Sequence, residues 1–347
     1  MSPLVQRGLA NFKANKRGFY SLWIFLGLFV LSLLAEFISN DRPILLLING
    51  DVFFPVIEKV TEREIGGELT IEADYKSDYI RDLFEEKDAF ALWPLIPYHH
   101  TTVDFFVNSA TPANPSAQHW LGTDDRGKDT LARLIYGFRL SVLFGVTVTF
   151  LSAIIGVTLG AIQGYFGGLI DLFGQRLVEI WSGLPVLLIL IILSTVVEER
   201  NVFFMIIILA AFSWMSLVAV VRAEFLRTRN FDYVRAARSL GVPNQIIMRR
   251  HVLPNAMVAT LTNLPFILCG AVTQLTALDF LGFGLPEGSP SLGELLRQGK
   301  GNLEAPWLGL TGFFTMAIML CLLIFVSEGV RDAFDPRRSL PTGDTNL

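Results

Sequence analysis

Long apolar runs separated by shorter polar segments dominate the chain. A helix needs roughly 20 mostly apolar residues to cross a membrane, and six runs of about that length are present. They cover residues 19–38, 140–162, 180–197, 202–221, 256–281 and 307–326. The third and fourth runs are separated only by Glu198-Glu199-Arg200-Asn201, which predicts a tight hairpin. We therefore predict an all-α integral membrane protein with six transmembrane helices.

The first apolar run allows two interpretations, a cleaved signal peptide and a retained anchor helix. A signal peptide has an apolar core of about 7–15 residues followed by a small-residue cleavage site. This run is longer and ends in Glu36-Phe37-Ile38-Ser39-Asn40, which is no such site. We therefore expect an uncleaved anchor helix next to a core of five transmembrane helices.

Three polar segments of the chain carry an excess of Arg and Lys over acidic residues. These are Arg7, Lys13, Lys16 and Arg17 before the first run, Arg222, Arg227, Arg229, Arg235, Arg238, Arg249 and Arg250 after the fourth, and Arg331, Arg337 and Arg338 after the last. With six spans, all three segments lie on one side of the membrane. Because basic loops stay on the cytoplasmic side, we expect both termini and the Arg-rich loop to be cytoplasmic.

The opposite side carries one large segment between the first and second runs, roughly 90 residues long. A structureless loop of that length is uncommon, so we expect a small folded extracytoplasmic domain inserted there. Its stretch 58–88 is rich in acidic residues. Within it, we expect a strand at 70–75 and a short helix at 78–88.

These observations predict four parts of the chain. Residues 1–39 form the cytoplasmic N-terminus and anchor helix, 40–136 the extracytoplasmic domain, 137–330 the transmembrane core with a cytoplasmic loop at about 222–256, and 331–347 a cytoplasmic tail.

Composition agrees with a membrane protein, because 52% of the residues are hydrophobic and only 17% are charged. Soluble domains carry about 25% charged residues. The formal net charge of -4 gives no general attraction to nucleic acid. Cys269 and Cys321 both lie inside apolar runs, where we expect small core residues rather than a disulfide.

The Arg-rich loop has the local signals of two short helices joined by a turn. Residues 233–240 are good helix formers, and Asn230 or Asp232 is placed to cap their N-terminus. Gly241 follows as a C-terminal helix stop. Pro243 is placed at the first position of a second helix.

That second helix should run to about Val252, because Pro254 disfavours helical backbone in the residue before it. In the first helix, Ala236 and Ala237 leave a flat surface that a partner protein can approach closely. An ordinary positively charged cytoplasmic loop would explain the arginines alone. It does not explain why a glycine and a proline stand, in that order, between two stretches that favour a helix.

The spacing Ala236-Ala237-x3-Gly241-x9-His251-x-Leu253-Pro254 resembles the EAA loop of ABC importer permeases. This chain has Arg235 where that family has Glu, and His251 where the family often has an aliphatic residue.

Two further segments resemble the C-type permeases of the dipeptide, oligopeptide and nickel group. They are 119–141, which reads HWLGTDDRGKDTLARLIYGFRLS, and 278–293, which contains LDFLGFGLP and SPSLG. The resemblance covers roughly residues 117–338 and the anchor. The long insertion at 40–117 is most similar to that in permeases of peptide and microcin C importers.

The resemblance implies a permease subunit that moves oligopeptides, microcin C-like peptides among them, across a bacterial inner membrane. Its expected partners are a homologous permease subunit, a cytoplasmic ABC ATPase, a periplasmic solute-binding protein and membrane lipid. The resemblance also implies that ATP and Mg²⁺ bind to the ATPase, so we expect no cofactor here. Coupling to the ATPase is expected from the loop residues Arg235, Ala236, Ala237, Gly241, Pro243, His251, Leu253 and Pro254.

Two clusters suggest other chemistry. The segment 122–129, GTDDRGKD, is close to a phosphate-binding loop, but Asp129 stands where Ser or Thr should ligate Mg²⁺. We expect Asp124 and Asp125 instead to cap a short helix at 130–136 that leads into the second span. His99, His100 and His119 lack metal-ligand spacing, and we expect surface or turn positions for them.

Alternatives to a peptide permease remain. A nickel or other small-solute importer fits the same motifs. A secondary transporter would place charges inside its spans, whereas Arg139, Glu179, Asp279 and Glu328 all fall near the ends of apolar runs. A membrane scaffold would act through the inserted domain. No nucleophile and base pair, paired catalytic carboxylates or cofactor fingerprint indicates an enzyme.

Overall fold

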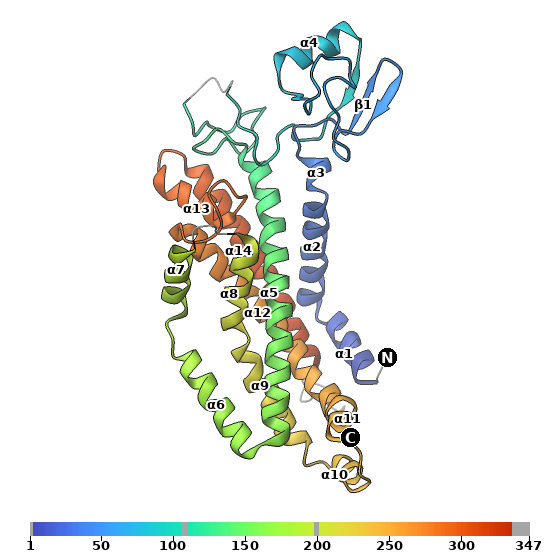
Figure 1. Ribbon diagram of the computed structural model, residues 1–347, viewed down its shortest axis with the longest axis vertical. Coiled ribbons are helices and arrows are strands. Elements are labelled where there is room, and N and C mark those ends of the chain that lie inside the picture. Colours follow the sequence, from blue (N-terminus) through green and yellow to red (C-terminus); the bar gives the residue numbers. More distant parts are fainter. Residues whose placement is uncertain (1–2, 106–109, 198–200, 335–347) are drawn as a thin grey trace, which may run out of the picture. The chain divides into compact units, whose positions relative to one another are not determined.

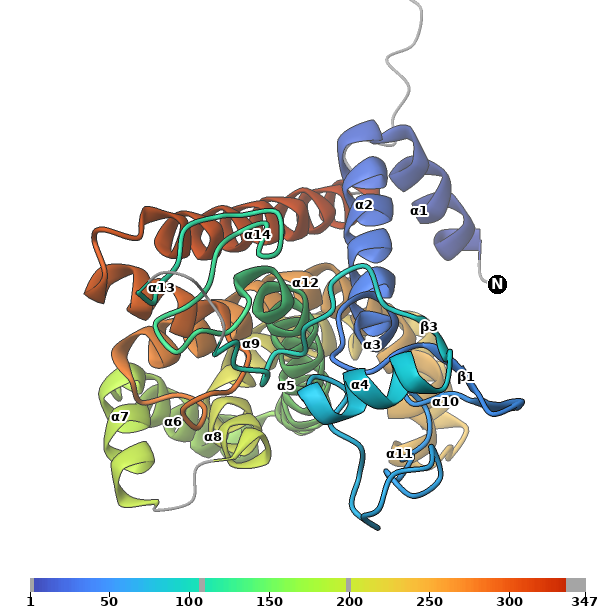
Figure 2. The same ribbon diagram turned by 90° about the horizontal axis from the view of Figure 1, so that it is seen from above.

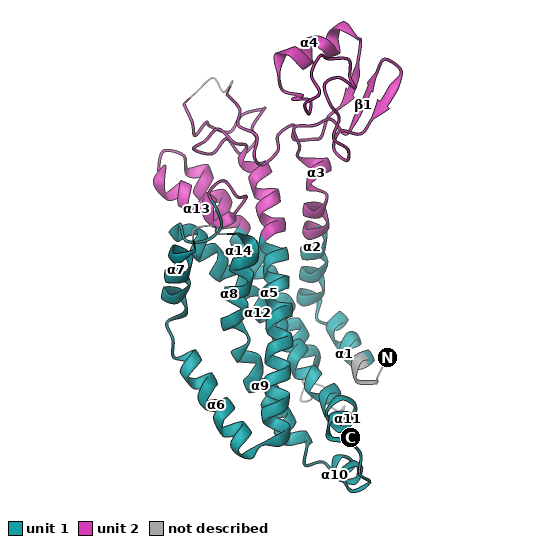
Figure 3. Cartoon of the chain, in the orientation of Figure 1, with its two compact units in different colours: residues 1–27, 141–286, 316–347 teal, residues 28–140, 287–315 magenta. Residues whose placement is uncertain are grey.

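A computed structural model describes residues 3–105, 110–197 and 201–334 of the chain (Figure 1). Most of the described residues are helical. The chain divides into two compact units (Figure 3). Unit 1 comprises residues 1–27, 141–286 and 316–347, and unit 2 comprises residues 28–140 and 287–315.

The helices of the two units follow the apolar runs, with several additions. Unit 1 contains α1 (Pro3–Ala14), α6 (Gly168–Ser182), α7 (Val186–Val196), α8 (Val202–Ser213), α9 (Met215–Thr228), α10 (Asp232–Ser239), α11 (Asn244–Ile246), a π-helical segment (Ile247–Val252) and α12 (Leu253–Leu281). Unit 2 contains α3 (Ala35–Ile38), β1 (Leu45–Ile48), β2 (Asp51–Phe53), α4 (Asp78–Glu86), β3 (Phe90–Leu92) and α13 (Leu292–Gly301). Helices α2 (Lys16–Leu33), α5 (Thr130–Phe166) and α14 (Pro306–Phe334) have residues in both units.

The helices provide four to six candidate membrane spans among the described residues. Four are long and apolar enough individually: α2, α5, the run Asn244–Leu281 and α14. Two bent pairs, α6 with α7 and α8 with α9, raise the number to six if each pair is one span. The all-α membrane fold predicted from the sequence is thus confirmed.

The predicted third span, 180–197, is wrong in its boundaries. Helix α6 ends at Ser182, α7 begins at Val186, and the pair bends by 73°. Pro185 explains the break, since it has no N–H to donate and disfavours helical backbone at Leu184. The predicted hairpin residues 198–200 lie outside the described residues.

Within unit 1, α5 packs against α9 along a stripe of glycines. A Cβ added at Gly156 would lie 2.7 Å from Leu217 Cβ, and one added at Gly164 would lie 2.6 Å from the Arg222 carbonyl oxygen. Small residues at this spacing let two helix backbones approach closely in a membrane. Helices α7, α8 and α9 also contact α12, and α7 lies beside α8 (Figure 2).

The inserted segment of unit 2 has its own small core. Its sheet has the strand order β2-β1-β3, with both pairs antiparallel. The inward residues Leu46 and Ile48 pack with Ile80 and Leu83 of α4, whose N-terminus is capped by the Ser77 hydroxyl. The expected helix at 78–88 is therefore found at α4.

The expected strand at 70–75 is wrong, because that segment forms only an isolated bridge between Thr61 and Glu72. Ala73 and Tyr75 are nevertheless buried in the core. These two buried residues alternate with exposed ones, which is the two-residue period of a strand, but the segment has no neighbouring strand to pair with over its length.

Candidate functional site

Helix α10 is the first arm of the Arg-rich loop and begins without a side-chain cap. Phe231 occupies the cap position in extended backbone, with φ -69° and ψ 147°. The predicted caps are therefore wrong: the Asn230 amide donates instead to the Leu226 carbonyl, 3.1 Å away. Asp232 lies in the first turn, where a carboxylate interacts favourably with the helix dipole.

Gly241 ends α10 as the sequence predicted. Its φ is +75°, in the left-handed region that glycine adopts without steric cost. The Gly241 N–H donates to the Arg238 carbonyl at 3.0 Å, and the Val242 N–H donates to the Ala237 carbonyl at 3.1 Å. These two bonds define a Schellman motif, so the chain reverses direction at a fixed geometry.

The second arm starts one residue later than predicted. Pro243 takes the cap position rather than the first helical position, with φ -58° and ψ 141°. Helix α11 follows and continues directly into the π-helical segment Ile247–Val252 and then into α12. The second arm is therefore the start of a long continuous helical run, Asn244–Leu281, not a separate short helix.

Pro254 does not stop this helix, contrary to the prediction. It lies in the first turn of α12, directly after the π-helical segment. A proline ring clashes with the carbonyl four residues earlier and cannot donate the α-helical bond. The wider π turn before Pro254 relieves the clash, whereas the missing N–H bond stays unmade.

The two arms share one apolar core with α5 and α9. Val234 and Ala237 of α10 pack with Ile247 and Val252 of the second arm and with Phe225. Ala236, in contrast, is exposed, and so is Arg235. The predicted flat surface of two alanines is therefore wrong, because Ala237 faces inward while Ala236 and Leu240, which is 83% exposed, face outward.

Tyr165, in the last turn of α5, contacts both arms. Its hydroxyl donates to the Asn244 Oδ1 atom of the second arm at 2.7 Å. The guanidinium of Arg238, on the first arm, lies 5.5 Å from its ring centroid, a cation–π distance. Sequence reasoning missed Tyr165, because nothing in its sequence neighbourhood marks a contact with residues so distant in the chain.

Two arginines tie the same region to neighbouring helices. Arg229 Nη1 donates to the carbonyls of Gly164 and Tyr165, at 3.1 and 3.2 Å, at the C-terminal end of α5. Arg222 on α9 forms a two-pronged ion pair with Asp171 on α6, with Nη2 and Oδ2 2.7 Å apart. These arginines, predicted only as a topology signal, therefore also stabilise the base of the loop.

His251 takes part through its backbone. Its carbonyl accepts a hydrogen bond from the Tyr233 hydroxyl at 3.3 Å, and its ring lies 6.4 Å from the Tyr233 ring. Asn255 donates to the same hydroxyl at 2.8 Å. Residues Arg235, Arg238, Arg249 and Arg250 are exposed. The loop is therefore a rigid elbow with a cationic outer surface.

The segment resembling a phosphate loop is a tight turn in unit 2. The Asp124 Oδ1 atom accepts from the backbone N–H groups of Arg126 and Lys128, at 2.9 and 2.8 Å. The cap of α5 is Asp129, which accepts from the Ala132 N–H at 2.7 Å, so the prediction of Asp124 and Asp125 as caps is wrong. The expected helix at 130–136 that leads into the second span is found as the beginning of α5, with which it is continuous.

His119 lies at a turn, one of the two predicted positions, because its carbonyl accepts from the Gly122 N–H at 2.9 Å, but its side chain is buried in unit 2 rather than at the surface. It is only 3% exposed and lies between two carboxylates, with Nδ1 2.8 Å from Asp129 and Nε2 3.2 Å from Asp104. Among the described residues, no group of three or more His, Cys, Asp or Glu side chains is arranged to hold a metal. The ring therefore links the 98–104 segment to the start of α5.

This arrangement predicts a pH-dependent stability. Burial lowers the pKa of His119, but the hydrogen bonds and charges of Asp129 and Asp104 outweigh it and raise the pKa overall above 6.5. A group whose pKa is higher in the folded state than in the unfolded state stabilises the fold. This stabilisation is fully present below the unfolded-state pKa and is lost as the pH rises through the folded-state pKa. We expect the thermal midpoint of the wild-type chain to fall as pH rises above about 6.5. The measurement is thermal unfolding in detergent against pH.

His119→Asn is the control, because asparagine keeps one donor but does not titrate in this range. The difference between wild type and variant should shrink with rising pH. A difference that stays constant from acid to alkaline pH would contradict a charged His119.

Comparison with known proteins gives the following matches. Residues 156–340 match the family described as "Binding-protein-dependent transport system inner membrane component". The chain is 55% identical over 340 residues to "Inner membrane ABC transporter permease protein YejE" of Escherichia coli (strain K12), covering 98% of this chain and 99% of that protein. It is 54% identical over 362 residues to "Peptidoglycan transport system permease protein YejE" of Agrobacterium fabrum, with 97% and 94% covered. It is 36% identical over 258 residues to "Oligopeptide transport system permease protein OppC" of Mycobacterium tuberculosis (strain ATCC 25618 / H37Rv), with 74% and 88% covered.

Proposed function

This chain belongs to the family of binding-protein-dependent transport system inner membrane components, and on that premise we propose that it is the permease subunit through which an ATP-driven importer moves short peptides. The elbow at the Arg-rich loop carries this proposal. It has the two properties that coupling to a separate ATPase requires, an exposed docking surface and a rigid connection to long apolar helices.

The docking surface is the outer face of α10 and the turn after it. Arg235, Ala236 and Leu240 are exposed there. A small residue beside exposed cations and a large apolar side chain suits a cleft in a partner that has an apolar floor and an acidic rim. We place the ATPase on this face, and ATP and Mg²⁺ on the ATPase itself.

The rigid connection runs through the core of the elbow. Motion of α10 passes to α5 through the contact of Arg238 with Tyr165, and to α12 through the continuous helical run that starts at Asn244 and is itself bonded to Tyr165. Because this core is closely packed, displacement of α10 moves α5 and α12 with it rather than deforming the loop. The pull of the ATPase thereby reaches the helices that line the pathway.

The cargo is proposed from the relatives. Two of the three relatives described above name oligopeptide or peptidoglycan as what their systems transport. The two related permeases named YejE match almost the whole chain, including the inserted segment, so we extend the peptide assignment to this chain, with microcin C-like peptides as one class of cargo.

The remaining partners follow from the type of transporter. A homologous permease supplies the second half of the pathway, and a periplasmic solute-binding protein delivers the peptide to the extracytoplasmic side. The positive-inside rule supports cytoplasmic termini and a cytoplasmic elbow. The inserted segment of unit 2 is then extracytoplasmic, next to the delivery site.

Site-directed cross-linking tests the docking surface. In a chain whose Cys269 and Cys321 are alanine, Ala236→Cys should cross-link to the ATPase in the assembled complex. Ala237→Cys is the matched control, because its side chain faces the core of the elbow one position away. We expect a strong product from position 236 and far less from position 237. Equal amounts of product from positions 236 and 237 would contradict docking on this face. So would the absence of product both from Ala236→Cys and from a Leu240→Cys variant.

A further inference from the structure

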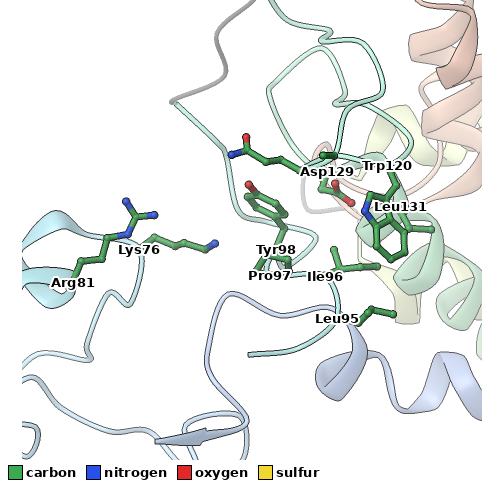
Figure 4. A pocket seen from close by; sticks show the side chains of 11 residues that line it. Lys76, Arg81, Leu95, Ile96, Pro97, Tyr98, Trp120, Asp129 and Leu131 are labelled. Carbon is green, nitrogen blue, oxygen red and sulfur yellow. The ribbon is translucent and has the colours of Figure 1, made fainter. Parts of the chain in front are cut away.

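Unit 2 contains a pocket that the coupling mechanism does not use. It has a volume of about 410 Å³, within the range of about 300–1,000 Å³ typical of ligand sites. One wall is formed by Lys76, just before the Ser77 cap of α4, and by Arg81 within α4 (Figure 4). The facing wall is formed by Leu95 and Tyr98 and by Trp120. All of its lining residues belong to the inserted segment or to the start of α5.

Lys76 is the unusual residue of this pocket. Its side chain is half-buried, and its Nζ atom lies 4.5 Å from the ring centroid of Tyr98 and 5.5 Å from that of Trp93. The backbone N–H of Lys76 donates to Asp74 Oδ1 at 3.1 Å, whereas its ammonium group has no hydrogen bond or ion pair among the described residues. Burial, and then the neighbouring Arg81 charge, lower the pKa of the ammonium group. The ammonium group therefore lines a partly desolvated space and keeps its three N–H donors for an anion that enters it.

The carboxylates around the pocket are already engaged elsewhere. Asp129 accepts from the Ala132 N–H and contacts His119. Asp104 accepts from the Tyr98 hydroxyl at 3.1 Å and contacts the other nitrogen of His119. These contacts hold Tyr98 in place beneath Lys76.

Arg81 is available as a second cation. Among the described residues it forms one ion pair, with Asp78, at 3.8 Å between two largely exposed side chains. Exposed pairs of this kind contribute little free energy, so Arg81 can turn toward an anion held by Lys76. Lys76 and Arg81 together form a cationic wall.

The facing wall is apolar and open. Trp120 is 52% exposed and Leu95 is 68% exposed. An exposed indole is a strong contact for an aromatic or aliphatic side chain. Gln118 also lines the pocket and offers both a donor and an acceptor to a peptide group.

We propose that this pocket binds the C-terminal end of a short peptide, with its carboxylate on Lys76 and Arg81 and its last side chain against Trp120 and Leu95. The choice of a peptide as ligand rests on the proposed function, whereas the pocket itself belongs to unit 2 and shares no residue with the elbow. In the importer, such a site would hold the end of a peptide on the extracytoplasmic surface before the peptide enters the pathway.

Binding is measured on the full chain with its companion permease in lipid nanodiscs, without ATPase or ATP. The probes are the tripeptide Ala-Ala-Phe and its C-terminal amide. Their binding is measured by saturation-transfer NMR, which detects weak binding. Loss of one charge-assisted contact should weaken binding about tenfold. We therefore expect the Kd of the amide to be about tenfold higher than that of the acid.

Three variants assign the site. Lys76→Gln should raise the Kd of the acid and leave that of the amide nearly unchanged, so that only the smaller preference for the acid that comes from Arg81 remains. Lys76→Arg should restore the affinity for the acid. Lys59→Gln is the matched control, because Lys59 is an exposed cation of the same inserted segment outside the pocket. Trp120→Ala should weaken Ala-Ala-Phe more than Ala-Ala-Ala.

Several outcomes would overturn the proposal. These are equal affinity for acid and amide, an unchanged Kd in Lys76→Gln, an equal loss in Lys59→Gln, or no binding of either peptide. Peptide uptake by the complete wild-type importer is measured in parallel. Uptake without binding at this pocket would contradict the proposed peptide site but leave the proposed peptide transport standing. Absence of both uptake and binding would contradict peptide transport itself.

Discussion

Replacing Gly241 with proline is expected to reduce ATP-driven uptake to less than about a tenth, while the amount of chain inserted in the membrane stays unchanged. Gly241 has φ +75°, which proline cannot adopt, and its N–H donates to the Arg238 carbonyl. Loss of this geometry costs about 3 kcal/mol or more locally. That cost falls on the elbow alone, so transport and insertion should separate. The measurement is peptide uptake per inserted transporter in proteoliposomes.

Two milder variants identify the cause. A Cβ at position 241 would meet no atom within 4 Å, so a side chain there causes no clash and only the backbone preference changes. Asparagine tolerates left-handed backbone better than other residues, so Gly241→Asn should keep most of the uptake and Gly241→Ala less. Normal uptake by Gly241→Pro would contradict the rigid elbow. Equal loss in all three variants would indicate instead that the space at position 241 is filled by the partner.

Replacing Arg133 with methionine is expected to destabilise the chain severely. Arg133 and Asp124 form an ion pair in which both side chains are almost completely buried. Removing one partner of such a pair costs about 3–5 kcal/mol, because the other charge stays buried without compensation. Arg133 also donates to the Ser289 carbonyl at 3.2 Å, so the variant loses a link to the segment before α13. The expected result is a large fall in thermal midpoint and in folded yield.

A second substitution tests whether the unpaired charge is responsible. Asp124→Asn removes the charge, but its side-chain oxygen can still accept from the Arg126 and Lys128 N–H groups. The double variant, Arg133→Met with Asp124→Asn, should therefore be more stable than Arg133→Met alone. If the double variant were the less stable of the two, the cost would come from packing rather than from the buried charge.

The sequence predicted the elbow in outline because its signals are local. A positive φ at a helix end needs glycine, and Gly241 supplied it in the expected place. Pro254 was misread because its effect depends on the width of the turn before it, and a π turn changes that width. Whether Ala236 or Ala237 is exposed depends on which face of α10 meets the core. Two adjacent alanines do not indicate that face.

Non-local contacts account for the other differences. A surface or turn position was predicted for His119 because Asp104 and Asp129 are distant from it in the sequence. In the fold these two carboxylates, one from each flanking segment, contact the two nitrogens of its ring. Tyr165 joins residues more than 70 positions away, and its hydrogen bond to Asn244 spans 79 positions. Apolar length predicted the membrane spans well, whereas the break before α7 depended on Pro185 overriding an apolar run.

The most direct test is uptake of a labelled oligopeptide into proteoliposomes that contain this chain, its companion permease, the ATPase and the solute-binding protein. The account predicts uptake that requires all four proteins and hydrolysable ATP, and that stops when ATP is replaced by a non-hydrolysable analogue. Uptake that persists without ATP or ATPase, or that follows an ion gradient instead, would contradict it and indicate a secondary transporter.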